Sequence, residues 1–341
     1  MTKTYDVAVV GATGTVGEAM LEILEQREFP VGRVFALASE RSAGKRVRFR
    51  DKSVSVADMA DFDFSRVQLA LFAVGDDVSQ RFAPKAAAHG CIVIDNSAYF
   101  RTDEDVPLIV PEVNPQALAG YRNRGIVASP GAATIQMAVV LKPIHDAAQV
   151  RRVNVASYQA VSGSGATGLR ELADQSARLL NAQAIKTPAV YAKQIAFNVL
   201  AQIDTIEDNG YTREEMTLVR ETRRLLDAPA MQINPTAVTV PVFFGHSEAV
   251  HVETRDKLSA AQARRLLHAA PGIELVDTPQ SHGYASAVTD AANQDAVFVS
   301  RIREDISCEN GLNFWVVADN VRKGAALNAV QIAEKLIEEH I

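Results

Sequence analysis

The sequence predicts an α/β protein: a Rossmann-type dinucleotide-binding domain followed by an α+β domain with a mixed sheet. Three observations lead to this prediction. In the first 130 residues, short apolar β-rich segments alternate with helical patterns, as in βαβ units. A glycine-rich turn separates the first strand pattern from the first helical pattern. In the second half, long strand patterns follow one another, which favours a mixed or antiparallel sheet.

The first domain is predicted over residues 1–130, with residues 320–341 returning to it. Strands are expected at 5–10, 34–38, 67–74, 91–94 and 126–128, and helices at 15–26 and 78–88. These strands are almost continuously apolar, which is typical of a parallel sheet covered on both faces. The final helical pattern, 325–341, has apolar residues at helical spacing, so we expect it to pack on this domain.

The second domain is predicted over residues 131–319. Helices are expected at 133–148, 169–182, 213–226 and 259–269, and strands at 150–161, 237–244, 249–254, 296–302 and 312–318. The segments 237–244 and 249–254 resemble two strands that pair with each other.

Composition narrows the class of protein. The 41 acidic residues outnumber the 35 basic ones, which disfavours a nucleic-acid partner. No apolar run reaches the length of a membrane span, and the N-terminus enters a strand without an apolar signal segment. Two cysteines and seven scattered histidines predict a reducing cytoplasm and no metal site.

The glycine-rich turn is the first candidate cofactor site. Glycine lets the backbone turn tightly and approach a pyrophosphate, whose charge is met by the helix N-terminus. The alternative is a purely structural turn, but the position between a strand and a helix favours the cofactor. The candidate residues are Gly11, Thr13, Gly14, Thr15, Val16 and Gly17.

The end of the second strand indicates which dinucleotide binds. An NAD site usually has a carboxylate here for the ribose, whereas Arg41 with Ser39 and Ser42 suits the 2′-phosphate of NADP. Glu40 could instead serve a ribose. We therefore expect NADP as the cofactor.

Several motifs in order resemble the aspartate-semialdehyde dehydrogenase family over nearly the whole chain. The matching segments are 11–17, 37–45, 95–101, 106–114, 157–165, 245–248, 317–320 and 322–326. The resemblance implies a cytoplasmic homodimer of amino-acid biosynthesis that carries out phosphorylating aldehyde oxidation with NADP. It also implies that residues 131–319 form the dimerisation and substrate domain. That chemistry uses a cysteine thiolate, which forms a thioester, and a histidine that moves the proton.

The resemblance also implies roles for individual residues. His246 is the proton-moving histidine, Gln159 the glutamine that holds the acyl group, and Arg101 the arginine that grips the phosphate. Further cofactor contacts are expected from Ser162, Gly163 and Asn320. A small-molecule ligand is therefore the expected partner besides a second copy of the chain.

Three positions depart from the family pattern. The nucleophile position is Ala132, the position of the substrate-carboxylate arginine is Thr239, and that of the phosphate lysine is Thr217. Alanine has no atom that can form an acyl bond. Loss at three separate sites is similar to the Usg-type relatives, which lack the catalytic cysteine. The leading hypothesis is a pseudoenzyme that keeps the dinucleotide-binding fold; the alternatives are an oxidoreductase on another aldehyde or keto substrate, and a regulatory partner without turnover.

Other residues have competing interpretations. Cys91 opens an apolar strand pattern and is expected in the core, while Cys308 is expected in a surface loop. Ser129 lies near Ala132 but has no identifiable base. Asp76 and Asp77 either cap a helix or repel cofactor phosphates. His246 is either a functional donor or only a hydrogen-bonded residue at a strand end.

Overall fold

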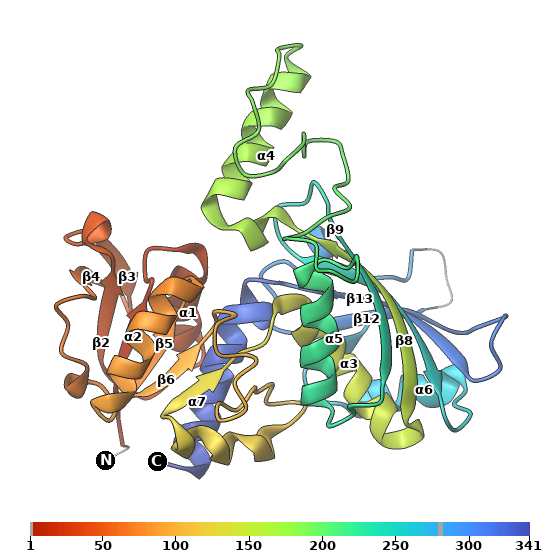
Figure 1. Ribbon diagram of the computed structural model, residues 1–341, viewed down its shortest axis with the longest axis horizontal. Helices are drawn as coiled ribbons and strands as arrows, with labels where there is room; N and C mark the ends of the chain where they lie inside the picture. Colours follow the sequence, from red (N-terminus) through yellow and green to blue (C-terminus); the bar gives the residue numbers. More distant parts are fainter. Residues whose placement is uncertain (1–2, 279–281) are drawn as a thin grey trace. The chain divides into compact units, whose positions relative to one another are not determined.

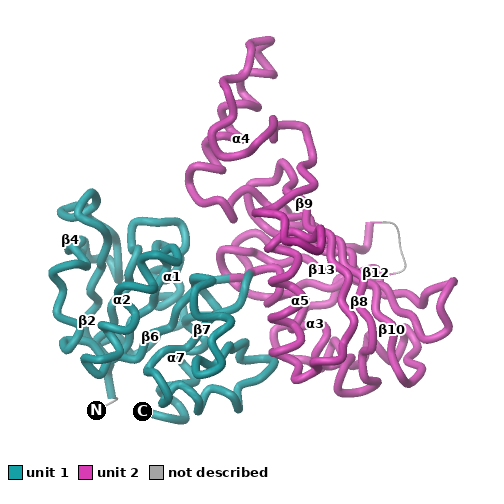
Figure 2. Tube along the Cα trace, in the orientation of Figure 1, with its two compact units in different colours: residues 1–131, 325–341 teal, residues 132–324 magenta. Residues whose placement is uncertain are grey.

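The computed structural model describes residues 3–278 and 282–341. The chain forms two compact units, residues 1–131 with 325–341 and residues 132–324 (Figure 2). The C-terminal helix α7 (Leu327–Glu339) belongs to the first unit, as its apolar pattern predicted.

A seven-stranded sheet forms the centre of the first unit, with the strand order β3-β4-β2-β1-β5-β6-β7. Its strands are β1 (Tyr5–Val10), β2 (Val31–Ala38), β3 (Arg46–Phe49), β4 (Lys52–Asp58), β5 (Leu69–Phe72), β6 (Ile92–Asp95) and β7 (Ile126–Ala128). All neighbouring strands are parallel except β3 and β4. The order runs outward in both directions from β1, so the loop after β1 lies at the switch point where dinucleotides bind in such sheets.

Helices cover this sheet. Helix α1 (Thr15–Gln26) and α7 contact each other and share one apolar core with Val7, Val9, Leu69 and Leu71 of the sheet. Helix α2 (Asp76–Ala88) packs against β5, β6 and β7. The predicted parallel sheet is confirmed, but the hairpin of β3 and β4 was missed because its many charged residues hide the strand pattern.

The second unit contains a six-stranded mixed sheet with the order β11-β12-β13-β10-β8-β9. Its strands are β8 (Val150–Gln159), β9 (Gln232–Thr239), β10 (His246–Thr254), β11 (Ile273–Leu275), β12 (Val297–Glu304) and β13 (Gly311–Ala318). Its helices are α3 (Ala132–Ala148), α4 (Gly165–Leu180), α5 (Arg213–Leu225) and α6 (Ala260–Ala269). Helix α3 contacts β8, β10, β12 and β13 as well as α5 and α6.

One predicted strand pairing is wrong. Strand β9 ends at Thr239 and pairs in parallel with β8, whereas β10 pairs antiparallel with β8 and β13. Strand β8 thus lies between the two segments that were expected to pair. Pro241 explains part of the error, since proline cannot donate to a ladder and residues 240–245 leave the sheet instead of forming a hairpin.

Helix α4 and the segment after it project from the sheet of the second unit (Figure 1). A small core formed by Val161, Leu172, Ile195 and Ala196 supports them. The Glu171 carboxylate accepts backbone hydrogen bonds from Ala189 and Val190 at 2.8 and 2.7 Å, which fixes the returning chain against the helix.

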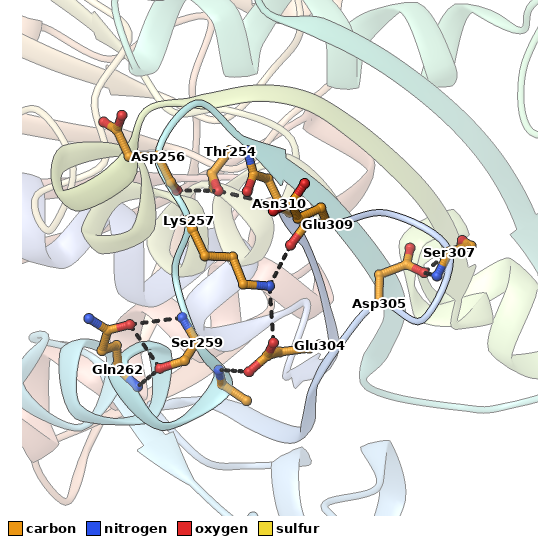
Figure 3. A network of polar contacts seen from close by, with 11 residues as sticks. Thr254, Asp256, Lys257, Ser259, Gln262, Glu304, Asp305, Ser307, Glu309 and Asn310 are labelled. Carbon is orange, nitrogen blue, oxygen red and sulfur yellow. Dashed lines mark hydrogen bonds and ion pairs between the residues drawn. The ribbon is translucent and has the colours of Figure 1, made fainter.

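A polar network connects the chain after β10 to the start of α6, the end of β12 and the turn before β13 (Figure 3). Lys257 lies 3.0 Å from the Glu304 carboxylate and also donates to the carbonyl oxygen of Glu309. Glu304 in turn accepts from the backbone N–H of Ala260 at the start of α6. Ser259 and Gln262 form a capping box at the same helix start. This end therefore has a structural network, and the candidate site lies at the opposite end of β10.

Candidate functional site

The glycine-rich loop adopts the geometry that a dinucleotide needs. Gly11 has φ 86°, and a Cβ there would lie 2.2 Å from the carbonyl oxygen of Ala73. A Cβ on Gly17 would lie 2.1 Å from the carbonyl oxygen of Gly11, so the turn closes onto the helix only without a side chain. Gly14 is the N-cap of α1 and has no side chain to fill its place, which leaves the helix N-terminus open toward an anion.

The end of β2 lies beside this loop. The backbone N–H groups of Gly11 and Ala12 donate to the carbonyl oxygen of Leu37 at 2.8 and 3.1 Å. The next residues, Glu40–Ser42, form a short 3₁₀-helix in which Arg41 is exposed. In the described part of the chain Arg41 has no ion pair, so its guanidinium is available to a phosphate.

Arg101 follows β6 at the same carboxyl edge of the first sheet. Its Nη2 donates to the carbonyl oxygen of Asn96 at 2.7 Å. Asp76 shapes the same loop, since its Oδ1 accepts from the backbone N–H of Ala98 at 2.8 Å. The N-cap of α2 is Gly75, and Asp76 and Asp77 occupy the first turn, where carboxylates are favourable to a helix N-terminus. Asp76 also braces the loop that carries Arg101.

Ala132 is the first residue of α3 in the second unit. Its Cβ packs closely against Gly324, where an added Cβ would come within 2.6 Å of it. Ala132, at the position predicted for the nucleophile, therefore carries a half-buried methyl group that leaves no room for a side chain on Gly324. The methyl group can neither ionise nor attack a carbonyl carbon.

His246 begins β10 and is buried with 3% exposure. Its Nδ1 accepts a hydrogen bond from the backbone N–H of Ala160 at 3.0 Å. Burial lowers the pKa of His246 to about 3, so the ring is neutral at physiological pH. With Nδ1 as an acceptor, the ring proton is on Nε2, which makes His246 a hydrogen-bond donor.

A polar cluster lies at the end of β8. Gln159 Nε2 donates to Glu214 Oε1 at 2.9 Å and to Ser157 Oγ at 3.3 Å. Thr239 pairs with Gln159 in the β8–β9 register and is buried, while Thr217 lies three residues after Glu214 on α5 and is half-buried. Thr239 thus adjoins Gln159, while Thr217 lies one helical turn from Glu214, the partner of Gln159.

Ser162 and Asn320 are also brought together. Asn320 Oδ1 accepts from Ser162 Oγ at 3.0 Å and from the backbone N–H of Gly245 at 2.9 Å. Since Gly245 directly precedes His246, these residues form one group with the histidine. Gly163 is exposed beside Ser162, where the backbone is open to a ligand.

Buried polar side chains continue along β10 beyond His246. Glu248 is two residues further along β10, has no exposed surface, and burial raises its pKa well above the ordinary value. The nearby Gln136 amide opposes this rise in pKa, and the negative charge of Glu214 adds to it. Neither Glu248 oxygen nor Gln136 Nε2 forms a hydrogen bond of normal geometry within the described chain. Burial thus favours the protonated form of Glu248.

Neither cysteine is a member of this group of residues. Burial raises the pKa of Cys91 to about 12, so it stays a protonated core residue, as its strand pattern predicted. Cys308 is half-buried in the turn that precedes β13. His246 pairs with Ala318 at the other end of β13, so Cys308 and the histidine are at opposite ends of the sheet.

Sequence reasoning missed Glu214 as a member of this cluster. Its signal was present in the pair Glu214-Glu215. Glu215 completes the capping box of Thr212 and accepts from the backbone of Ala237, so it is occupied by structure. The other glutamate is left for Gln159. Groups of three or more His, Cys, Asp or Glu residues that could hold a metal are absent from the described residues. In that part of the chain we also find no helix long and apolar enough to cross a membrane.

Both units match known families. Residues 6–121 match the family described as semialdehyde dehydrogenase, NAD binding domain. Residues 141–323 match the family described as semialdehyde dehydrogenase, dimerisation domain. The first match agrees with the nucleotide-binding geometry of the glycine-rich loop.

Full-length relatives carry an enzyme name. A protein of Shewanella sp. (strain DB6705) named aspartate-semialdehyde dehydrogenase is 53% identical over 340 residues, with 100% of both chains covered. A Vibrio cholerae protein named aspartate-semialdehyde dehydrogenase 2 is likewise 53% identical over 340 residues, again with 100% of both chains covered.

Solved structures have the same fold. A crystal structure of aspartate semialdehyde dehydrogenase II complexed with ASA from Vibrio cholerae has a TM-score of 0.98 at 52% identity, covering 100% of both chains. A probable aspartate-semialdehyde dehydrogenase from Pseudomonas aeruginosa has a TM-score of 0.94 at 39% identity, covering 99% of this chain and 100% of the other.

Proposed function

Because the chain belongs to the aspartate-semialdehyde dehydrogenase family, we propose that it is an NADP-binding, Usg-type member without the phosphorylating dehydrogenase activity. The observation that carries this proposal is Ala132 at the nucleophile position. A methyl group cannot form the thioester through which the family's reaction passes. Without an acyl–enzyme bond, there is no covalent intermediate with which phosphate can react.

The two threonines support the same conclusion. At the family's carboxylate and phosphate clamps, Thr239 and Thr217 offer hydroxyl groups in place of a guanidinium and an ammonium. Each lost charge-assisted contact would weaken substrate binding by roughly 1.5–3 kcal/mol. Gln159, His246 and, in the other unit, Arg101 remain as the family's polar residues. Aspartate semialdehyde therefore loses both its attacking group and two of its binding groups.

The first unit keeps the features of an NADP site. Backbone groups of the Gly11–Gly17 loop would hold the pyrophosphate, and Arg41 with Ser39 and Ser42 would hold the 2′-phosphate. In the second unit, Ser162, Gly163 and Asn320 are the residues that the resemblance assigns to the nicotinamide side. NADP, when bound, supplies or accepts a hydride. What the chain's own residues do is orient the cofactor and donate hydrogen bonds.

A homodimer through the second unit is part of the proposal. Residues 141–323 match a dimerisation domain. Leu180, Phe197, Val199 and Ile206, on or after helix α4, have exposed fractions of 77%, 66%, 56% and 61%. Large apolar side chains exposed together on a projecting segment indicate a surface that is covered in the assembled protein.

One observation favours a second candidate, an oxidoreductase on a different aldehyde or keto substrate. Hydride transfer itself needs no cysteine but does need a polarised carbonyl. His246, held neutral with its proton on Nε2, is suited to donate a hydrogen bond to a carbonyl oxygen. A regulatory partner without turnover is the third possibility, and it predicts no reaction with any carbonyl substrate.

The test is a turnover assay with the purified full chain. One arm follows NADPH formation from aspartate semialdehyde with phosphate; another follows NADPH oxidation with a panel of uncharged and cationic aldehydes and ketones, without phosphate. Absence of phosphate-dependent NADPH formation is the expected result. Turnover within about a hundredfold of an ordinary rate, on the order of 10 per second, would overturn the proposal. Phosphate-independent turnover in the second arm would select the oxidoreductase.

A further inference from the structure

Lys45 closes the loop that follows β2, and none of the roles assigned above falls on it. Its Nζ donates a hydrogen bond to Ser42 Oγ at 3.3 Å. Its backbone N–H donates to the carbonyl oxygen of the same serine at 3.2 Å. These two contacts bring the exposed lysine back beside Ser42, one of the residues proposed to hold the 2′-phosphate.

The backbone fixes the point from which this lysine extends. Gly44 has φ 83°, in the region that favours glycine, and so reverses the chain just before Lys45. The Gly44 N–H donates to the carbonyl oxygen of Val56, and the Val56 N–H donates to that of Lys45, both at 2.9 Å. Val56 lies in β4, which pairs with β2, the strand from which the loop starts. Both ends of the loop are therefore attached to the sheet.

The neighbouring cation, Arg46, points to a different partner. Its Nε donates to Ser53 Oγ at 2.5 Å, and its Nη2 donates to the carbonyl oxygen of Ser53 at 3.0 Å. Ser53 belongs to β4, so this guanidinium lies along the hairpin of β3 and β4. Among the hydrogen bonds of the described residues, it is the Lys45 side chain that reaches the loop.

The contact between Lys45 and Ser42 leaves donors for an anion. A hydroxyl oxygen can accept one hydrogen bond while its proton is donated elsewhere. Lys45 uses an acceptor site of Ser42 Oγ, and within the described chain no acceptor takes the hydroxyl proton. The ammonium group has three donors, of which Ser42 uses one. The pair can therefore donate to phosphate oxygens from both side chains.

The charge of the loop shows why a second cation matters. Glu40 and Arg41 are adjacent and opposite in charge, so without Lys45 their charges cancel. A phosphate monoester carries a charge of about −1.5 to −2 at pH 7, and Glu40 repels it. Across residues 3–278 and 282–341, neither Arg41 nor Lys45 forms a salt bridge with a carboxylate. Lys45 thus gives the loop a net positive charge that a phosphate can use.

We propose that Lys45 is a second cationic residue for the 2′-phosphate of NADP, and that it sets the preference for NADP over NAD together with Arg41. The inference rests on the NADP site proposed above and adds one residue to it. The Lys45 ammonium contacts the phosphate and also holds Ser42 with its proton available. The ribose of NAD has a hydroxyl group at this place, so NAD gains little from the ammonium.

Adenosine fragments test this role without any turnover. Calorimetry would measure the dissociation constants of the full chain for adenosine 2′,5′-bisphosphate and for adenosine 5′-monophosphate, which differ only in the 2′-phosphate. Lys45→Gln should weaken binding of the bisphosphate roughly 5- to 20-fold and leave the monophosphate unchanged. Added salt should reduce the preference of the wild type more than that of the variant, because salt screens exposed charges.

Two further variants are controls. Lys52→Gln removes an exposed lysine at the other end of the same hairpin, where Lys52 pairs with Phe49. It should leave both dissociation constants unchanged. Lys45→Arg keeps the positive charge and should keep most of the preference for the bisphosphate.

Each contrary result has a distinct meaning. A wild-type chain that binds both fragments equally, or neither at millimolar concentration, overturns the NADP site and this inference with it. A wild-type preference that Lys45→Gln leaves unchanged overturns the role of Lys45 and leaves the NADP site to Arg41. An equal loss of both fragments in Lys45→Gln also overturns it, because the lysine would then serve only the shape of the loop.

Discussion

Lowering the pH from 7 to 5 should expose the burial of His246 as a loss of stability. The folded-state pKa of His246 is lowered to about 3, against 6.5 when the ring is in water. Below pH 6.5 the ring becomes protonated in the unfolded chain, whereas it stays neutral in the native chain. Stability from this residue is therefore complete above pH 6.5 and is lost as the pH falls toward 3. By this linkage, His246 alone removes about 2 kcal/mol between pH 7 and pH 5.

The assay is urea unfolding followed by Trp315 fluorescence, which reports on the same unit as His246. The perturbation is His246→Gln, whose carbonyl oxygen can accept the Ala160 N–H but cannot titrate. The difference in unfolding free energy between wild type and variant should change by about 2 kcal/mol from pH 7 to pH 5. A difference that stays constant within about 0.5 kcal/mol would refute a neutral, buried His246.

Glu248→Gln is the control of opposite sign. Burial raises the pKa of Glu248 far above its ordinary value, so the native chain keeps a proton that the unfolded chain releases above pH 4.5. Wild type should therefore lose stability relative to this variant as the pH rises. Parallel pH profiles of wild type and variant would show that Glu248 is not held neutral.

Three further predictions concern the site. Ala132→Cys alone should restore little phosphate-dependent turnover, because neither substituted clamp position can hold the substrate. When Thr239→Arg and Thr217→Lys are added, the increase in kcat/KM should exceed the sum of the increases from the single changes. Full rescue by Ala132→Cys alone would contradict this prediction. Arg41→Ala should weaken NADP binding by roughly 10- to 150-fold and leave NAD unchanged in calorimetry, whereas equal losses for both would remove the role of Arg41. Gly17→Ala should abolish binding of both dinucleotides and destabilise the chain by about 1–3 kcal/mol, and calorimetry with thermal unfolding would detect a tolerated side chain.

Local signals predicted the first unit well. Strand β1, the glycine-rich loop and helix α1 follow one another within 26 residues, so their pattern and their geometry depend on the same short segment. The structure also explains two of those glycines, since Gly11 and Gly17 each face a backbone oxygen at a distance no Cβ could occupy.

Contacts between residues that lie far apart in the sequence could not be predicted from sequence patterns. Gln159 and Glu214 are 55 residues apart, and Ser162 and Asn320 are 158 apart. Their meeting depends on the strand order of the second sheet. The order could not be read from the local periodicity that indicated the strands, and for the same reason the pairing of 237–244 with 249–254 was wrong.

Intact-protein mass spectrometry tests most directly whether the chain has lost the covalent route. The full chain would be mixed with aspartate semialdehyde and NADP without phosphate, so that any acyl–enzyme accumulates. The wild-type mass should stay unchanged, while the triple variant with Ala132→Cys, Thr239→Arg and Thr217→Lys should gain an aspartyl group. An acyl adduct on the wild-type chain, mapped to Ser129 or to any other residue, would contradict the claim that Ala132 makes the chain inactive as a phosphorylating dehydrogenase.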